Sequence, residues 1–249
     1  MTQTGSALPP PSRARRLLEP LALLALLAGL WFAMTAPPDA TQGDFYRILY
    51  IHVPSAWLAF LAFGVTAVGS IGYLIGRRRS WDRVAAASAS VGVVFTALTL
   101  VTGSIWGRPV WGVWWDFGDA RLMSTAIMFF VYLGYLALRR TVEDPETRAL
   151  RSAVLGAVAV IQVPLVYFSV NLFRTLHQTQ TIRPDGAAME PEMLLALLVN
   201  VVAFTVLYAA LLARRIEVGR LEEIAEELTP AEPAGRAVQP PPLGEVGGG

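Results

Sequence analysis

Six apolar runs, each long enough to cross a lipid bilayer as a helix, constrain this 249-residue chain more than any other feature of its sequence. The apolar core of a bilayer is about 30 Å thick and takes roughly 20 residues of helix. Charged residues make up only 16% of the chain, against about 25% in typical soluble domains. The sequence therefore predicts an all-α integral membrane protein with six transmembrane helices and no separate soluble domain. The runs cover residues 17–36, 54–76, 84–105, 122–138, 152–173 and 193–213.

The distribution of arginine predicts how these helices are oriented. All twenty basic residues are Arg, and fifteen of them lie on one side of the predicted spans and five on the other. The positive-inside rule assigns the side with fifteen, together with both termini, to the cytoplasm. We therefore expect a multi-pass protein of the cytoplasmic (inner) membrane. Its three outward loops are expected at about residues 37–53, 106–121 and 174–192.

The two ends of the chain are predicted to be short cytoplasmic segments. The first apolar run resembles a signal peptide, but Thr-Ala-Pro-Pro at residues 35–38 is a poor cleavage site, so we expect a retained anchor. The expected division is an N-terminal segment (1–16), a six-helix membrane domain (17–215) and a tail (216–249). Within the tail, residues 218–228 form a short amphipathic candidate. Pro, Gly and Ala dominate the rest, which predicts a largely disordered end.

The chain has no cysteine and only two histidines, His52 and His177. Each lies where an outward loop meets a predicted helix. Alone, each is explained as an interfacial residue that hydrogen-bonds a helix end. Together, two neutral imidazoles that approach from opposite sides would supply both axial nitrogens to a haem iron. They are too few for a closed structural zinc site, which takes four ligands.

The middle outward loop, residues 106–119, carries four of the seven tryptophans. An aromatic belt at the membrane surface is the alternative explanation, but a belt needs neither glycines nor charged residues among the rings, so we favour a surface that binds a flat ligand. The spacing of three of these tryptophans would place them on one face if the segment were a short interfacial helix. Glycines among the rings permit a flat ligand to approach the backbone, and Arg108 or Arg121 would pair with haem propionates. The tryptophans are Trp106, Trp111, Trp114 and Trp115.

Five stretches make the chain resemble the WWD domain of haem-handling proteins, and specifically the haem exporter protein C family (CcmC, also HelC). The similarity extends over about residues 17–213. The stretches are Ile-His-Val-Pro-Ser-Ala-Trp at 51–57, Thr-Gly-Ser-Ile-Trp-Gly-Arg-Pro-Val-Trp-Gly-Val-Trp-Trp at 102–115, Asp-Ala-Arg-Leu at 119–122, Tyr-Leu-Gly-Tyr at 132–135 and Thr-Leu-His-Gln at 175–178.

This resemblance implies a haem handler of cytochrome c biogenesis and not an enzyme. It implies that haem b is bound transiently and non-covalently at the outer face, with His52 and His177 as axial ligands. The haem would then be delivered to the haem chaperone CcmE, in a complex with the ABC transporter pair CcmA and CcmB and with CcmD. The platform for the chaperone would be formed by Trp111, Trp114 and Trp115, with Trp106 and Phe117 on its flank.

The chain departs from the family pattern directly after the paired tryptophans. Phe117 replaces a tryptophan, Gly118 is inserted and Met123 takes the place of a threonine. We align Asp119 with the acid of the family, because Ala-Arg-Leu follows it, and keep Asp116 as the alternative. The acid is expected to orient the loop or to contact the chaperone.

Other functions remain to be weighed against haem delivery. A cytochrome b-type electron-transfer subunit would usually place its histidines inside helices, often in pairs. A WWD-family haem lyase would usually be larger and would carry further histidines. A transporter is less favoured, since no predicted helix has a charge near its centre. No basic cluster interleaved with aromatic residues indicates a nucleic-acid partner.

Overall fold

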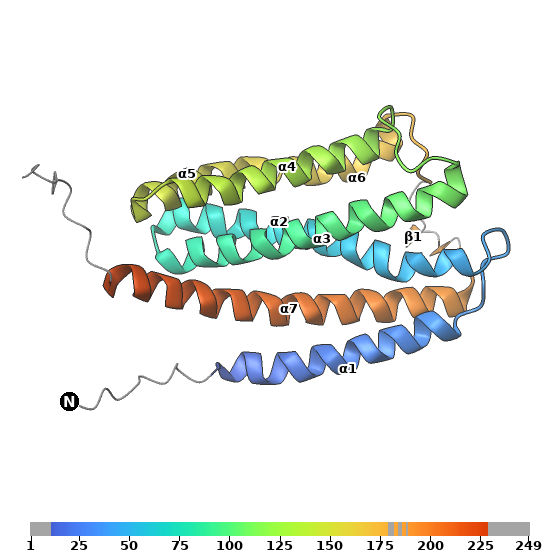
Figure 1. Cartoon of the computed structure of the whole chain (residues 1–249), viewed down its shortest axis with the longest axis horizontal. Helices are drawn as coiled ribbons and strands as arrows, with labels where there is room; N and C mark the ends of the chain where they lie inside the picture. The colour runs from blue at the N-terminus through green and yellow to red at the C-terminus, as the bar shows by residue number, and fades with distance from the viewer. Residues whose placement is uncertain (1–10, 179–181, 184–185, 188, 229–249) are drawn as a thin grey trace, which may run out of the picture.

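The computed structural model describes residues 11–178, 182–183, 186–187 and 189–228, and these form an elongated helical bundle (Figure 1). Within that part of the chain, six segments are long and apolar enough to cross a membrane, which confirms the predicted fold class. The tail residues 229–249, for which disorder was predicted, lie outside the described residues. The helices are α1 (Arg13–Thr35), α2 (Leu49–Gly76), α3 (Arg79–Trp111), α4 (Ala120–Thr141), α5 (Pro145–Ala159), α6 (Gln162–Leu172) and α7 (Pro191–Leu228).

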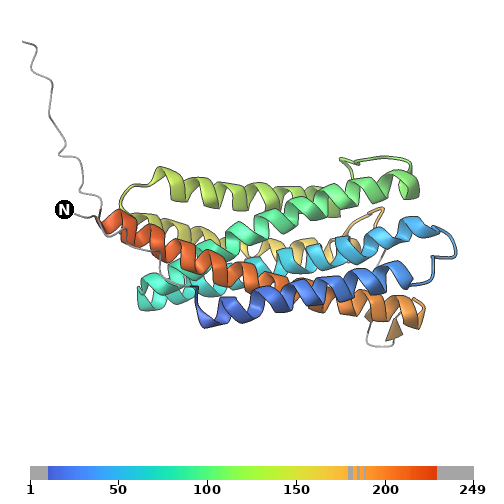
Figure 2. The same ribbon diagram turned by 60° about the horizontal axis from the view of Figure 1, so that its bottom comes forward.

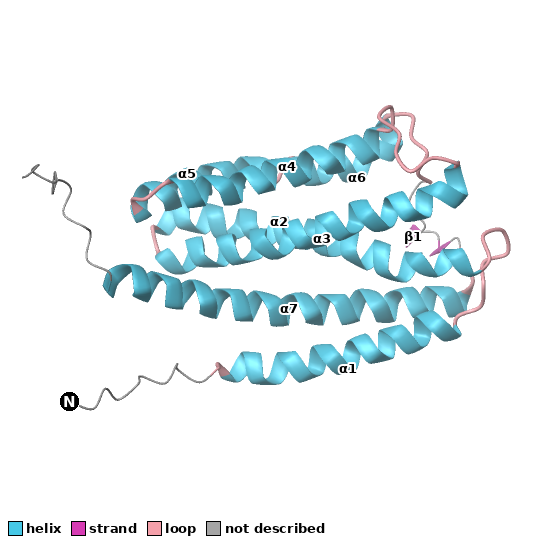
Figure 3. Ribbon diagram, in the orientation of Figure 1, coloured by secondary structure: helices cyan, strands magenta, loops and turns pink. Residues whose placement is uncertain are grey.

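Two short elements complete the described structure (Figure 3). A 3-10 helix, η1 (Asp44–Ile48), leads directly into α2. The two-residue strands β1 (Ile182–Arg183) and β2 (Gly186–Ala187) pair antiparallel. Both elements belong to loops that were predicted to face outward.

The fifth span is broken into α5 and α6 at Val160 and Ile161. Pro164 explains the break, because it has no N–H to donate to the carbonyl of Val160 and its ring crowds that carbonyl. The N–H of Val163 donates to this oxygen instead, at 3.0 Å, in a tighter turn. The sequence predicted one continuous run over this region.

Helices α2 and α3 form the antiparallel hairpin that positions the candidate site. Arg77, in the left-handed conformation at φ 50°, ends α2 and allows the chain to reverse within two residues. Small residues then hold the two helices close together. A Cβ on Gly69 would lie 2.9 Å from the backbone nitrogen of Ala85, and a Cβ on Gly92 would lie 2.6 Å from Phe63. The start of α2 and the end of α3 therefore meet at one end of the bundle.

Helix α7 lies beside α1 and is longer than any membrane crossing requires (Figures 1 and 2). The amide of Asn200 donates to the carbonyl of Gly29 at 3.0 Å, and the missing side chain of Gly29 makes room for it. Polar contacts between helices and small residues are typical of membrane helix packing. Residues 218–228, predicted as a separate amphipathic segment, continue α7 without interruption.

Candidate functional site

The tryptophan-rich segment is divided between a helix and a loop, which corrects the prediction of one outward loop. Helix α3 continues through Pro109 to Trp111 and ends at Gly112, whose φ of 79° suits glycine. Trp106 and Trp111 are therefore on α3. Residues 112–119 form no helix, so the short interfacial helix suggested by the tryptophan spacing is absent from this described segment.

A cavity of about 230 Å³ lies where α2, the end of α3, the start of α4 and the loop after α6 meet. It brings together five residues that the sequence singled out from distant positions. Gln42, which the sequence did not single out, also lines it. The five predicted residues are His52, Trp106, Trp111, Arg121 and His177.

The His52 ring lies against α3, and its contacts assign its tautomer. Its Nδ1 is 3.0 Å from the hydroxyl of Thr102. That hydroxyl donates its one hydrogen to the carbonyl of Leu98 at 2.7 Å, so it accepts from Nδ1–H of His52. The lone pair of His52 is therefore on Nε2. A Cβ on Gly103 would lie only 3.0 Å from Cε1 of the ring, so the absence of a side chain at Gly103 leaves room for the imidazole.

Trp106 forms an aromatic wall beside His52. The two rings meet edge to face, with centroids 5.7 Å apart. The indole N–H of Trp106 donates to the side-chain oxygen of Gln42 at 2.7 Å. Asp39 holds Gln42 in place, because its carboxylate accepts from the N–H of Gln42 at 2.8 Å. The first outer loop thus supplies a polar residue to the cavity.

Asp119 joins α4 to the loop that carries His177. Its Oδ1 accepts from the N–H of Leu122 at 2.9 Å and so caps α4. Its Oδ2 accepts from the hydroxyl of Thr175 and from the N–H of Leu176, both at 2.6 Å. Burial, at 2% exposed, raises the pKa of Asp119, but these three hydrogen bonds outweigh it and lower that pKa below its usual value. The carboxylate is ionised at neutral pH.

His177 is held between this carboxylate and a tryptophan. Its Nδ1 lies 3.4 Å from Oδ1 of Asp119, which favours a proton on Nδ1 and leaves the lone pair on Nε2. The centroid of its ring is 4.7 Å from that of Trp111. Burial lowers the pKa of His177 below its usual value, although Asp119 opposes the shift. The imidazole is therefore neutral at pH 7, as metal ligation requires.

The two arginines predicted to pair with propionates are placed differently. Arg121 lines the cavity, donates to the carbonyl of Tyr167 at 2.9 Å, and has a buried Nε with no hydrogen-bond partner among the described residues. Arg108 is exposed, does not line the cavity, and donates to the carbonyl of Gly112. The structure thus favours Arg121 as the group that meets an anion.

Three further predicted aromatic residues lie outside the cavity. Trp114 is 59% exposed and Phe117 is 81% exposed. Trp115 packs edge to face with Phe117, with centroids 6.3 Å apart. Asp116, the alternative acid, accepts from the N–H of Gly118 at 2.8 Å and shapes the turn of the loop. Asp119 alone of the two acids contacts His177.

The donor set of the cavity fits haem better than a bare metal ion. No group of three or more His, Asp or Glu side chains gathers for a metal within the described part of the chain. Two neutral imidazoles, two indoles and a buried guanidinium nitrogen instead match an iron, a flat ring and a carboxylate. Sites that enclose drug-sized ligands measure about 300–1,000 Å³. The cavity, at about 230 Å³, is smaller than this range. It would therefore hold only part of a porphyrin and leave the rest exposed.

Comparison with known proteins identifies a family over almost the whole chain. The family model described as Heme exporter protein C matches residues 7–229. The chain is 43% identical over 190 residues to Heme exporter protein C of Bradyrhizobium diazoefficiens, covering 76% of this chain and 72% of that protein. It is 36% identical over 208 residues to Heme exporter protein C of Haemophilus influenzae, covering 83% and 84%. It is 35% identical over 184 residues to a cytochrome c biosynthesis ccmC-like mitochondrial protein of Marchantia polymorpha, covering 74% and 76%.

Proposed function

This chain belongs to the haem exporter protein C family, and we propose that it binds haem between His52 and His177 and delivers it to the haem chaperone CcmE during cytochrome c maturation. The family itself supports a role in haem export for cytochrome c biogenesis. A member is a haem-handling membrane component of a maturation complex, and the haem is its cargo and not a catalytic cofactor.

One observation carries the proposal: the only two histidines of the chain line one cavity, and each has its Nδ1 turned to a partner. Thr102 occupies Nδ1 of His52, and Asp119 faces Nδ1 of His177. Both Nε2 atoms are thereby left as lone-pair donors. Ligating histidines usually have their other ring nitrogen engaged in this way, which orients the ring and raises the basicity of the ligand.

The remaining cavity residues suit a non-covalently held haem b. Trp106 and Trp111 would pack against the porphyrin, because aromatic side chains bury large apolar areas. Arg121 would pair with a propionate, which would satisfy its buried Nε. The chain has no cysteine that could form a thioether to the haem vinyl groups.

The position of the exposed aromatics supports transfer to a partner. Because the cavity is small, an edge of the bound haem would project from it. Trp114 and Phe117, on the loop between α3 and α4, present apolar surface beyond the cavity. We propose that CcmE docks on this loop, with Trp115 supporting it, and that CcmA, CcmB and CcmD are the other members of the complex.

The orientation follows from the arginine count. We propose that the protein lies in the cytoplasmic (inner) membrane with both termini in the cytoplasm and the haem cavity at the outer face. Among the described residues, the end that carries the cavity has five arginines and the other end has fourteen.

The rival functions fit this site less well. A cytochrome b-type subunit would hold its haem between histidines within helices, whereas His177 lies in the loop after α6. A WWD-family haem lyase would carry further histidines, and this chain has two. The cytochrome b alternative also gives no reason for exposed aromatic residues beside the cavity.

An optical spectrum of the purified protein, followed by capture of CcmE, tests the proposal. We expect a six-coordinate, low-spin haem spectrum and a complex with CcmE that forms only when haem is present. Protein that purifies without haem and takes up none on titration would contradict haem binding. A haem-loaded protein that never captures CcmE would contradict delivery and leave the cytochrome b alternative in its place.

A further inference from the structure

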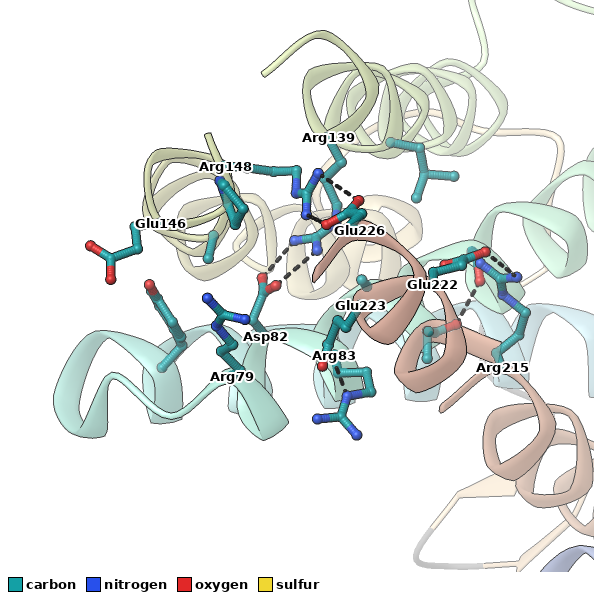
Figure 4. Close-up of a pocket in the computed structure, with 18 of the residues that line it drawn as sticks. Arg79, Asp82, Arg83, Arg139, Glu146, Arg148, Arg215, Glu222, Glu223 and Glu226 are labelled. Atoms are coloured by element: carbon teal, nitrogen blue, oxygen red, sulfur yellow. Dashed lines mark hydrogen bonds and ion pairs between the residues drawn. The ribbon is translucent and has the colours of Figure 1, made fainter. Parts of the chain in front are cut away.

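A second cavity, of about 390 Å³, opens at the other end of the bundle from the histidines (Figure 4). Arg77, at the end of α2, lines it and lies 25 residues beyond His52, which is roughly 38 Å along a helix. Its walls come from the ends of α2 and α4, the starts of α3 and α5, and the extension of α7. The volume is within the range of ligand sites, which is about 300–1,000 Å³.

The cavity is lined by seven arginines and five acids, which leaves an excess of two positive charges. Four of the arginines are engaged in ion pairs, which the dashed lines of Figure 4 mark, and three of these pairs join different helices. Their side chains cannot turn to a ligand without giving up an acid. The pairs are Arg139–Asp82, Arg83–Glu223, Arg148–Glu226 and Arg215–Glu222.

Two guanidinium groups on the rim are not committed in this way. Arg77 and Arg140 line the cavity, are exposed, and form no ion pair with any described residue. The guanidinium of Arg77 lies over the ring of Tyr73, 5.7 Å from its centroid, which holds it beside the cavity. Guanidinium matches phosphate by paired N–H donors, and it is more weakly hydrated than an ammonium group.

A few apolar side chains lie among the charged residues of the lining and bear on the source of the phosphate. Ala87 and Ala149 are buried in its lining, and Leu136 lies beside them. Gly219 lets α7 close the cavity, because a Cβ there would lie 3.1 Å from Cγ of Arg83. Exposed arginines beside apolar lining residues, at the arginine-rich end of a membrane bundle, suit a lipid headgroup with its glycerol better than a free ion.

We propose that this cavity binds the phosphate of an anionic phospholipid from the cytoplasmic leaflet, with Arg77 and Arg140 as its ligands. The bound lipid would join α2 to α4 at their ends, where ion pairs already join α3, α4, α5 and α7. The site shares no lining residue with the haem cavity. A negative result here would therefore leave the proposal of haem delivery untouched.

The test compares two double variants of the full-length protein in lipid nanodiscs. R77Q/R140Q removes the proposed ligands, and R13Q/R16Q removes two exposed arginines of α1, at the same end of the bundle, that do not line the cavity. Nanodiscs of phosphatidylcholine, with or without cardiolipin or phosphatidylglycerol, supply the lipid. Inorganic phosphate in neutral nanodiscs is the soluble probe. The readouts are retained lipid by native mass spectrometry and the midpoint of thermal unfolding.

We expect wild type and R13Q/R16Q to retain an anionic lipid and to be stabilised by it. R77Q/R140Q is expected to bind that lipid at least tenfold more weakly, since each of the two lost charge-assisted contacts alone would weaken binding by roughly that factor, and its haem spectrum should be unchanged. Equal losses in both variants, or no lipid retained by wild type, would overturn the proposal. Stabilisation by inorganic phosphate equal to that by lipid would overturn the assignment to a lipid.

Discussion

The carboxylate of Asp119 lies 3.4 Å from Nδ1 of His177 while it caps the first turn of α4. One side chain therefore ties the position of a proposed iron ligand to the start of a membrane helix. The residues are 58 positions apart in the chain, and the loop between α6 and β1 reaches Asp119 through Thr175 and Leu176. Any shift of α4 relative to this loop would move the imidazole of His177.

Asp119→Asn should weaken haem binding while it keeps the fold. Asparagine caps helices as well as aspartate does, so α4 should be retained, although its amide nitrogen cannot accept from the N–H of Leu176 as Oδ2 does. The negative charge that faces Nδ1 of His177 is lost, and loss of such a partner typically costs 10–100-fold in metal affinity. Haem titration followed by absorption measures the change, and Asp116→Asn is the matched control. Equal affinities for the two variants would contradict the role of Asp119.

His52→Ala and His177→Ala should each convert the six-coordinate haem spectrum to a five-coordinate one and lower haem retention. Each substitution removes one of the two proposed axial nitrogens. Added imidazole should restore the six-coordinate spectrum in either variant, because the cavity left by the side chain is open to a small ligand. Two single variants that purify with unchanged haem and spectrum would show that axial ligation is wrong.

The helical fold and the separate site residues were predictable from sequence, because they depend on local pattern. Apolar runs define spans, and the arginine count defined which loops share a side. The predicted run ended at residue 105, whereas α3 continues to Trp111. Pro109 and the polar side chain of Arg108 both disfavour a continuing helix in the sequence. Gly112, which ends it in a left-handed conformation, was the available signal.

Contacts between helices were beyond the reach of sequence reasoning. Thr102 carries no signal for a histidine partner 50 residues away, and Gln42 is one polar residue among several in its loop. The choice between Asp116 and Asp119 also depended on the path of the loop after α6. Residues 218–228 were predicted as a short amphipathic segment of the tail, whereas they continue α7 and Glu223 pairs with Arg83 of α3.

Thr102→Val should weaken haem binding by a small factor and broaden the spectrum. Valine has the shape of threonine but cannot accept from Nδ1 of His52, so the ring loses the contact that orients it. A neutral hydrogen bond contributes about 0.5–1.5 kcal/mol, so affinity should fall roughly 2–10-fold. Thr102→Ser keeps the hydroxyl and should bind as wild type does. Identical titrations for the two variants would rule out the orienting role.

Arg121→Gln should weaken binding of haem but not of haem dimethyl ester, whose propionates carry no charge. The buried Nε of Arg121 has no partner in the described structure, so a propionate would gain a charge-assisted bond there. Such bonds contribute about 1.5–3 kcal/mol. Arg108→Gln, outside the cavity, is the control and should leave both affinities unchanged. A loss that is equal for haem and its ester would mean that Arg121 acts on the fold and not on a propionate.

Trp114→Ala, Trp115→Ala and Phe117→Ala should impair capture of CcmE more than they change the spin state of the iron. Trp114 and Phe117 are exposed and do not line the cavity, whereas Trp111 packs on the ring of His177. An interface tryptophan that acts as a hot spot costs about 2 kcal/mol or more when truncated. The measurement is the yield of the haem-dependent complex, with the absorption spectrum recorded on the same samples. Trp31→Ala removes an equally exposed indole from α1 and should have no effect on capture. If the three variants capture CcmE as wild type does, the exposed rings serve only as an aromatic belt at the membrane surface.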